Sequence, residues 1–260
     1  GLTLRTIQIR DGVAEVRAGA TLLYDSDPDA EEQETRLKAS ALLNAIKQPR
    51  DSATETVRAE GGANGPGVGK KILLVDYQDS FVHTLANYLR QTGAEVTTMR
   101  YGFSAEILRE VSPDLMVLSP GPGRPVDFNI SDTVQMGVDQ EVPMFGVCLG
   151  LQGLVEHFGG RLGVLDYPMH GKPSEIKVTG GLMFGGLPSQ FKVGRYHSLH
   201  ALSARIPEDF EVTAVTDDDV VMAVEHTELP IWAVQFHPES ILSLEGSVGL
   251  KLINNLMKMV

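Results

Sequence analysis

Strand-like and helix-like segments alternate between residues 70 and 160, and this alternation constrains the fold more than any other feature of the sequence. The strand-like runs are "KKILLVDY", "AEVTTMR", "DLMVLS" and "PMFGVC", and a helix-like segment follows each of them. The first run is continuously apolar, as expected of a strand that is buried on both faces. The order β-α-β-α predicts a parallel, doubly wound sheet with helices on both sides. Ligands of such sheets bind at the carboxyl ends of the strands.

The sequence after about Arg161 becomes rich in strands. The expected strands are "SEIKVT", "FKVGRYHSLHAL", "FEVTAVT", "DVVMAVEH" and "IWAVQFHPE". Ser243 is in position to cap a closing helix over "LEGSVGLKLINNLMKM". We therefore predict an α/β fold for residues 70–260: a doubly wound, mostly parallel sheet flanked by helices, with an added strand-rich part.

The first 69 residues differ in composition from the rest of the chain. Two β-rich runs flank Asp11-Gly12, a strong hairpin signal, and the acidic segment after Asp27 and Pro28 has the pattern of a helix. One hairpin and one helix cannot bury a core of their own. Residues 1–48 are therefore expected to be a small α+β remnant of a larger domain, and the Gly- and Pro-rich stretch 49–69 a flexible linker. The strand-like opening "GLTLRTIQIR" also predicts a fragment of a longer protein.

The charge and cysteine content exclude several classes of function. The net charge of −12 argues against a protein that binds the phosphate backbone of nucleic acids, because such a protein needs a basic face. No apolar run approaches the roughly 18 residues that a membrane span requires. The single cysteine excludes an internal disulfide framework and a cysteine-rich zinc site. A reducing, cytoplasmic location is the natural expectation.

That cysteine, Cys148, lies where a buried strand turns into a helix, in "FGVCLGLQGL". Gly146 and Gly150 flank it, and two such glycines would occur together by chance roughly once in a hundred. The spacing fits a nucleophile elbow, in which small neighbours permit a strained turn and the helix N-terminus favours the thiolate. A small buried hydrophobe is the alternative. The glycines favour a nucleophile.

A nucleophilic thiol needs a base, and His237 is the strongest candidate among the seven histidines. It follows an apolar strand in "WAVQFHPES", and Pro238 biases it toward an extended backbone. Glu239, two residues further on, can project to the same side and orient the imidazole as the third member of a triad. In isolation, "HPES" would fit a surface turn better. Beside the cysteine elbow, we interpret it as the base and its orienting acid.

A second strand is expected to end in "LSPGPGRP", a loop of small and rigid residues. Gly121 or Gly123 could donate a backbone N–H group to an oxyanion, whereas Pro122 cannot. The amide of Leu149, directly after the cysteine, is a second possible donor. The alternative is an ordinary Pro/Gly turn.

Together, "SPGPG", "GVCLGLQ", "HGK", "RYHSL" and "QFHPES" resemble the class I, triad-type glutamine amidotransferases, and most of all the glutaminase domains of anthranilate synthases. The resemblance covers essentially all of residues 70–260. It implies that Cys148 attacks the side-chain amide of L-glutamine, forming a glutamyl thioester and releasing ammonia. It also implies that Gln152, with the backbone at Ser198 and Leu199, recognises the glutamine. The glutaminase itself needs no cofactor. The opening "DYQDSF" departs slightly from the "DNYDSF" that is usual in the family.

The first 48 residues resemble the C-terminal end of the chorismate-binding synthases of the same pathway. Glu31 and Glu34 lie at i and i+3 of the expected helix, on one face, and two such carboxylates suit Mg²⁺. The resemblance assigns this pair as metal ligands of the complete synthase. It also assigns Arg5 and the turn at Gly19–Ala20 to the binding of substrate carboxylates, although Thr21 departs from the usual Gly-Ala-Gly. In this chain alone, Glu31 and Glu34 could instead be the solvated acidic start of a helix.

The order synthase end, linker, glutaminase resembles fused bacterial anthranilate synthases, which are multifunctional lyases of tryptophan biosynthesis. The implied function is to supply ammonia for the amination of chorismate, with the synthase domain of the same chain as partner and a homo-oligomer as the complete enzyme. One alternative keeps the chemistry and makes aminodeoxychorismate or aminodeoxyisochorismate, for folate or phenazine pathways. Others are a catalytically silent interaction domain and a cysteine hydrolase or protease on a related sheet.

Overall fold

A computed structural model describes residues 6–10, 13–17, 65–243 and 245–260. The chain divides into two compact units, residues 1–56 and 57–260, and each is described by itself. In the first unit, β1 (Thr6–Arg10) and β2 (Val13–Arg17) pair antiparallel with Thr6 opposite Arg17. This pairing confirms the predicted hairpin. Its turn, Asp11-Gly12, and the helix predicted after Asp27 lie outside the described residues.

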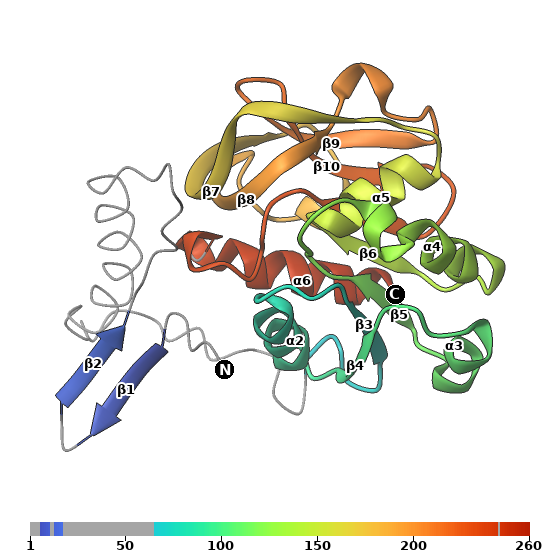
Figure 1. The fold of residues 1–260 in the computed structure, drawn as a ribbon, viewed down its shortest axis with the longest axis horizontal. Helices are drawn as coiled ribbons and strands as arrows, with labels where there is room; N and C mark the ends of the chain where they lie inside the picture. The colour runs from blue at the N-terminus through green and yellow to red at the C-terminus, as the bar shows by residue number, and fades with distance from the viewer. Residues whose placement is uncertain (1–5, 11–12, 18–64, 244) are drawn as a thin grey trace. The chain divides into compact units, whose positions relative to one another are not determined.

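The second unit is built on one nine-stranded sheet with the strand order β4-β3-β5-β6-β11-β10-β9-β7-β8 (Figure 1). The five strands of the parallel half are β4 (Glu95–Arg100), β3 (Lys71–Asp76), β5 (Leu115–Leu118), β6 (Met144–Val147) and β11 (Ile231–Val234). The antiparallel half continues from β11 with β10 (Val221–His226), β9 (Phe210–Thr216), β7 (Leu162–Val178) and β8 (Gln190–Ala201). The strand-rich part thus extends the parallel sheet, and the predicted fold class is confirmed as a mixed sheet.

Helices cover both faces of the parallel half (Figure 1). Helices α2 (Val82–Gln91) and α6 (Val248–Met259) contribute to one core, and α3 (Ala105–Val111), α4 (Ile130–Asp139) and α5 (Leu149–His157) to the other. The alternating side chains of β3 explain why both faces are buried. Ile72 and Leu74 lie in the α2–α6 core, whereas Leu73 and Val75 lie in the opposite one.

Five short 3₁₀ helices complete the described part of the second unit. They are η1 (Pro125–Phe128), η2 (Leu182–Phe184), η3 (Ser203–Arg205), η4 (Ile241–Ser243) and η5 (Glu245–Ser247). Residues 65–69, expected as the end of the linker, form a turn in which the amide of Gly67 donates to the carbonyl oxygen of Thr92 at 2.9 Å. This turn is thereby tied to the end of α2.

Two helix starts differ from what the sequence predicts. "DSFVHTLANYLRQTG" predicts a helix capped by Asp79 or Ser80, but neither side chain caps α2, because the carboxylate of Asp79 accepts the amide of Phe81 and forms a turn that leads into the helix. The prediction that Ser243 caps the closing helix is wrong. That helix, α6, begins at Val248 after left-handed backbone at Gly246 and Ser247, and Ser243 lies in η4 instead. In the described part of the chain, no helix has the length and apolar character needed to cross a membrane.

Candidate active site

Cys148 occupies a strained turn between β6 and α5. Its backbone has φ 53° and ψ −98°, a conformation that side-chain-bearing residues rarely adopt. The flanking glycines make this turn possible because the backbones on either side approach closely. A Cβ atom on Gly150 would lie 2.4 Å from the carbonyl oxygen of Leu118, and one on Gly146 would lie 2.6 Å from the carbonyl carbon of Gly150. The strand-to-helix elbow expected from the sequence is thus present.

The strand that carries His237 lies directly beside the strand that carries Cys148. β11 pairs in parallel with β6, so that Val234 is opposite Val147, and the amide of Cys148 donates to the carbonyl oxygen of Val234 at 2.8 Å. Parallel strands end at the same edge of a sheet, and the segment after β11 therefore leaves the sheet next to the elbow. In this way residues 148 and 237 meet although they are far apart in the sequence.

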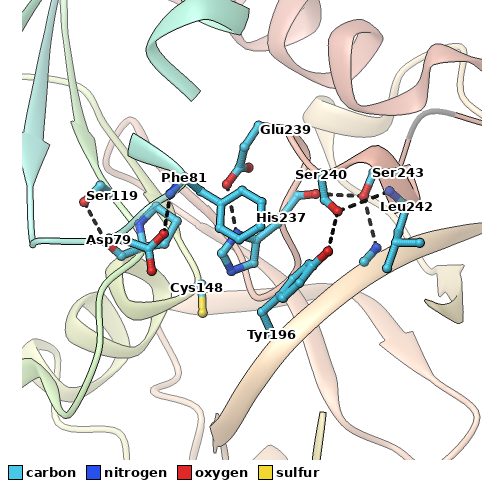
Figure 2. A network of polar contacts seen from close by, with 12 residues as sticks. Asp79, Phe81, Ser119, Cys148, Tyr196, His237, Glu239, Ser240, Leu242 and Ser243 are labelled. Atoms are coloured by element: carbon cyan, nitrogen blue, oxygen red, sulfur yellow. Dashed lines mark hydrogen bonds and ion pairs between the residues drawn. The ribbon is translucent and has the colours of Figure 1, made fainter. Parts of the chain in front are cut away.

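His237 and Glu239 form a buried pair. The imidazole Nδ1 lies 2.9 Å from Glu239 Oε1, and the two side chains are 2% and 0% exposed. Burial lowers the pKa of His237, but the charge of Glu239, its hydrogen bond to Nδ1 and the nearby Cys148 thiol raise it, and the resulting pKa lies well above the usual value. A carboxylate on Nδ1 favours the tautomer that turns Nε2 toward the thiol. Figure 2 shows Glu239 and Cys148 on different sides of the ring.

Two aromatic side chains pack against the imidazole and against each other, the ring centroids of Phe81 and Tyr196 being 4.9 Å apart (Figure 2). The ring of Phe81, at the start of α2, has its centroid 4.8 Å from that of His237, and the ring of Tyr196, on β8, has its centroid at 5.0 Å. The hydroxyl of Tyr196 is 3.0 Å from Ser240 Oγ, in the segment after His237. These contacts restrict ring rotation and exclude water from the pair.

The segment that carries His237 is also tied to β8 through its backbone. The amide of His237 donates to the carbonyl oxygen of Gly194 at 3.1 Å, and the two residues form an isolated antiparallel bridge. A side chain at position 194 would have no room, because Ser240 and Leu242 occupy the space where a Cβ atom would lie. Ser243 Oγ completes the connection, accepting the amide of Gly194 at 3.0 Å and donating to the carbonyl oxygen of His237 at 2.7 Å.

Two of the three residues predicted to recognise glutamine are in direct contact. Gln152, in the first turns of α5 and 3% exposed, donates from Nε2 to the carbonyl oxygen of Leu199 at 3.0 Å. Its second hydrogen bond, of 3.3 Å, goes to Oε1 of Gln235, whose Nε2 lies 3.5 Å from Cys148 Sγ. The third predicted residue, Ser198, precedes Leu199 on β8, and its hydroxyl is 3.5 Å from Nε2 of His170.

The two predicted oxyanion glycines differ in their surroundings. Gly121 lies against the elbow helix, since a Cβ atom there would be 2.3 Å from Leu149 Cδ2 and 2.9 Å from the carbonyl oxygen of Tyr77. Gly123, which has φ +71°, is exposed and lies beside the carboxylate of Asp127 instead. The packing therefore brings Gly121, but not Gly123, into contact with the residue that follows the cysteine.

The comparisons with known proteins agree with this geometry. Residues 73–256 match the family model described as glutamine amidotransferase class-I. The aminodeoxychorismate/anthranilate synthase component 2 of Bacillus subtilis is 38% identical over 188 residues, which cover 72% of this chain and 95% of that protein. This chain belongs to the class I glutamine amidotransferase family. The family predicted from the sequence motifs is thereby confirmed.

Other similarities of this amidotransferase extend beyond the glutaminase part. Residues 1–44 match the family of chorismate binding enzymes. An anthranilate synthase of Azospirillum brasilense is 59% identical over 257 residues, 99% of this chain but only 35% of that protein, so this chain spans about a third of its length. The fold is similar to that of a solved Thermoplasma acidophilum protein assigned to GMP synthase, with a TM-score of 0.66 and 26% identity, covering 73% of this chain and 93% of that one.

The remaining predicted site residues of the amidotransferase chain lie outside the described residues. They are Arg5, Gly19, Ala20, Glu31 and Glu34. Within the described ranges no group of three or more His, Cys, Asp or Glu side chains is arranged to hold a metal ion. The assignment of these five residues to a chorismate and Mg²⁺ site stays a prediction.

Sequence reasoning missed several residues that contact Cys148 or the His237–Glu239 pair. Gln235 and Tyr196 stand inside the motifs "QFHPES" and "RYHSL", so the signal was present, but nothing local showed that they contact Cys148 and His237. Phe81 is the aromatic residue of "DSF", and nothing in the sequence around it indicates a contact with His237. Ser243 was interpreted as a helix cap because one of its two partners, Gly194, is 49 residues away in the sequence.

Proposed function

We propose that this chain hydrolyses L-glutamine to glutamate and ammonia with Cys148 as nucleophile, His237 as general acid and base, and Glu239 as the group that orients His237. The observation that carries the proposal is the buried Nδ1–Oε1 contact of 2.9 Å beside a cysteine with φ 53° at a strand-to-helix elbow. A buried His–Glu pair next to a thiol is an arrangement that activates a cysteine for acyl transfer. A core cysteine needs neither the strained turn nor the pair.

In the first half of the reaction, the Cys148 thiolate attacks the side-chain carbonyl carbon of glutamine and a C–S bond forms. The carbonyl oxygen becomes an oxyanion, for which the amides of Leu149 and Gly121 are the candidate donors. The pKa of His237 is raised well above its usual value, which favours the protonated imidazole. His237 gives this proton to the amide nitrogen as the C–N bond breaks, and ammonia leaves a glutamyl thioester.

In the second half, His237 takes a proton from water, and the resulting hydroxide attacks the thioester carbonyl. The C–S bond breaks, the thiolate leaves and glutamate is formed. Gln152 and the backbone at Ser198 and Leu199 are proposed to hold the substrate throughout. The hydrogen bond between Gln152 and the Leu199 carbonyl, at 3.0 Å, supports this, because it unites the elbow helix and β8 into one side of a site.

We further propose that the ammonia serves the amination of chorismate to anthranilate in tryptophan biosynthesis, by a synthase domain in the same longer chain. The match of residues 1–44 to chorismate binding enzymes and the 59% identity to an Azospirillum anthranilate synthase support this acceptor. The complete enzyme would then be a cytoplasmic lyase and a homo-oligomer, with Glu31 and Glu34 among the residues that hold Mg²⁺ in the synthase.

A second acceptor reaction, the formation of aminodeoxychorismate, has a specific observation in its favour. The Bacillus subtilis relative, 38% identical to this chain, carries both products in its name. The glutaminase residues are the same for both products, and the synthase region decides between them. Supplying that region and identifying the aromatic product distinguishes the two acceptors.

The test of the glutaminase is ammonia release by wild type and by Cys148→Ser, each with and without the missing synthase region. We expect Cys148-dependent release that increases when the synthase region is present. A diazo-ketone analogue of glutamine should label Cys148, identified by peptide mass mapping. Activity that survives in Cys148→Ser would disprove the mechanism, and no adduct on Cys148 with the synthase region restored would favour a silent interaction domain.

A further inference from the structure

A continuous chain of buried polar groups connects the nucleophile to β8. It begins at Arg195, whose Nε donates to His197 Nε2 at 3.0 Å, and His197 Nδ1 lies 2.8 Å from the carbonyl oxygen of Leu199. The same carbonyl accepts Gln152 Nε2, and Gln152 contacts Gln235, which reaches Cys148 Sγ. Arg195 is 2% exposed, His197 3% and Gln235 0%, so water has little access to the chain.

In this series of hydrogen bonds, the chemistry of the groups determines which one donates and which one accepts. A guanidinium group only donates, so His197 Nε2 accepts and its ring hydrogen is on Nδ1, facing the carbonyl oxygen of Leu199. Burial and the charge of Arg195 lower the pKa of His197 to about 3, which keeps this ring neutral. The carbonyl oxygen of Leu199 therefore accepts the Nδ1–H group of His197.

The orientation of the amide groups of Gln152 and Gln235 is determined in the same way. The carbonyl oxygen of Leu199 only accepts, so the group of Gln152 that faces it must be the NH₂ group. The second hydrogen of that NH₂ group points at Gln235 and requires an oxygen there, which leaves the NH₂ group of Gln235 toward Cys148 Sγ. At 3.5 Å, this contact has the length expected for a hydrogen bond to sulfur.

We propose that Gln235 is a further catalytic residue, whose side-chain N–H group donates to Cys148 Sγ and stabilises the thiolate. Gln152 and the Leu199 carbonyl act as positioning groups, since they determine which end of the Gln235 amide faces the sulfur. This inference rests on the proposed function of Cys148 as nucleophile. A donor that favours the charged form of the sulfur helps twice, because the thiolate is the attacking group in the first half-reaction and the leaving group in the second.

The inference is tested by alkylation of Cys148 with iodoacetamide as a function of pH, without glutamine. Cys148 is the only cysteine of the 260 residues, so the reaction has no background from other thiols. In Gln235→Met, which keeps the size of the side chain and removes its N–H group, we expect the midpoint of the rate profile to move to higher pH by about one unit. Gln152→Met should move it in the same direction by less, because Gln235 keeps its amide but loses its orientation.

The matched control is Gln140→Met. Gln140 also donates from a partly buried amide to a backbone carbonyl, that of Ala105. This carbonyl is not one of the hydrogen-bonded groups that link Arg195 to Cys148. Its profile should coincide with that of wild type. Circular dichroism and thermal melting establish that each variant is folded. If Gln235→Met does not fold, Gln235→Asn gives the same test, because it withdraws the amide by one methylene and keeps its polarity.

An unchanged alkylation profile in folded Gln235→Met would overturn the inference. The failure of the proposed function has a different signature: no Cys148-dependent release of ammonia from glutamine when the synthase region is present. The alkylation measurement needs neither glutamine nor turnover, and therefore it reads the contact between Gln235 and Cys148 independently.

Discussion

Ser243 Oγ donates a 2.7 Å hydrogen bond to the carbonyl oxygen of His237, six residues earlier in the chain. The hydroxyl oxygen of Ser243 also accepts the amide of Gly194, on β8, at 3.0 Å. Ser243 is 1% exposed, so water cannot replace either bond. One hydroxyl group therefore fixes the backbone of His237 relative to β8, and it does so from outside the proposed triad.

Replacement of Ser243 by alanine should lower both stability and activity. The variant leaves a buried carbonyl and a buried amide without their partner, which costs about 2 kcal/mol of unfolding free energy. We expect a lower kcat for glutamine hydrolysis with a smaller change in KM, since the base moves relative to the thiol while the substrate contacts remain. Urea unfolding and steady-state kinetics measure the two effects.

The control for Ser243→Ala is Ser203→Ala, at an exposed position in η3. It should change neither quantity. A Ser243→Ala protein with the unfolding free energy of wild type would contradict the role assigned to this hydroxyl.

Ser243 also illustrates what the sequence could and could not predict. The buried strands β3, β5 and β6 and the elbow at Cys148 were predictable because their signals are local: apolar runs, turn residues and flanking glycines. A serine ahead of an apolar helical stretch has the local signal of a cap, and that prediction was wrong because its partner Gly194 is 49 residues away. Gln235 was likewise missed, since Cys148 and Gln152 are 87 and 83 residues distant.

The Glu239→Gln variant should lose most of the glutaminase activity. The amide keeps the shape of the carboxylate but can donate to Nδ1 of His237, which favours the wrong tautomer of the base. We expect kcat to fall by at least about a hundredfold in the complete enzyme. Glu208→Gln, at an exposed position, should retain the activity of wild type. Equal activity of Glu239→Gln and wild type would remove Glu239 from the mechanism.

The same pair predicts a loss of stability at alkaline pH. The folded protein holds a proton on His237 above the pH at which the unfolded chain releases it, because the folded-state pKa is raised well above its usual value. The stabilisation from His237 is therefore complete below about pH 6.5 and decreases as the pH rises toward the folded-state pKa. In Glu239→Gln the carboxylate charge is absent and this decrease should disappear. Urea unfolding at intervals between about pH 6 and 9 measures it, and parallel curves for the two proteins would contradict the prediction.

His197 predicts the opposite dependence, in acid. Its pKa is lowered to about 3 by burial and by the charge of Arg195. Below about pH 6.5 the imidazole therefore binds a proton in the unfolded chain but stays neutral in the folded protein. The contribution of His197 to the unfolding free energy is complete above about pH 6.5 and falls by about 1.4 kcal/mol per pH unit as the pH decreases toward about 3.

The difference in unfolding free energy between wild type and His197→Gln should thus shrink by about 2 kcal/mol from about pH 7 to pH 5. A difference that stays constant would refute this, and replacement of the exposed His83 by Gln is the control.

The glycines of the elbow predict a steric effect that can be separated from chemistry. In Gly150→Ala the new methyl group would lie 2.4 Å from the carbonyl oxygen of Leu118, which belongs to a central strand and cannot move aside. We expect a loss of at least about 2 kcal/mol in unfolding free energy, because overpacking against backbone forces the helix away from the sheet.

The control is Gly180→Ala. There the atom nearest to the new methyl group is a flexible Glu211 carboxylate oxygen at 3.4 Å, and that variant should have the stability of wild type. Thermal and urea unfolding of both proteins decide the matter. If Gly150→Ala were as stable as Gly180→Ala, the close approach of α5 to β5 would not explain why residue 150 is a glycine.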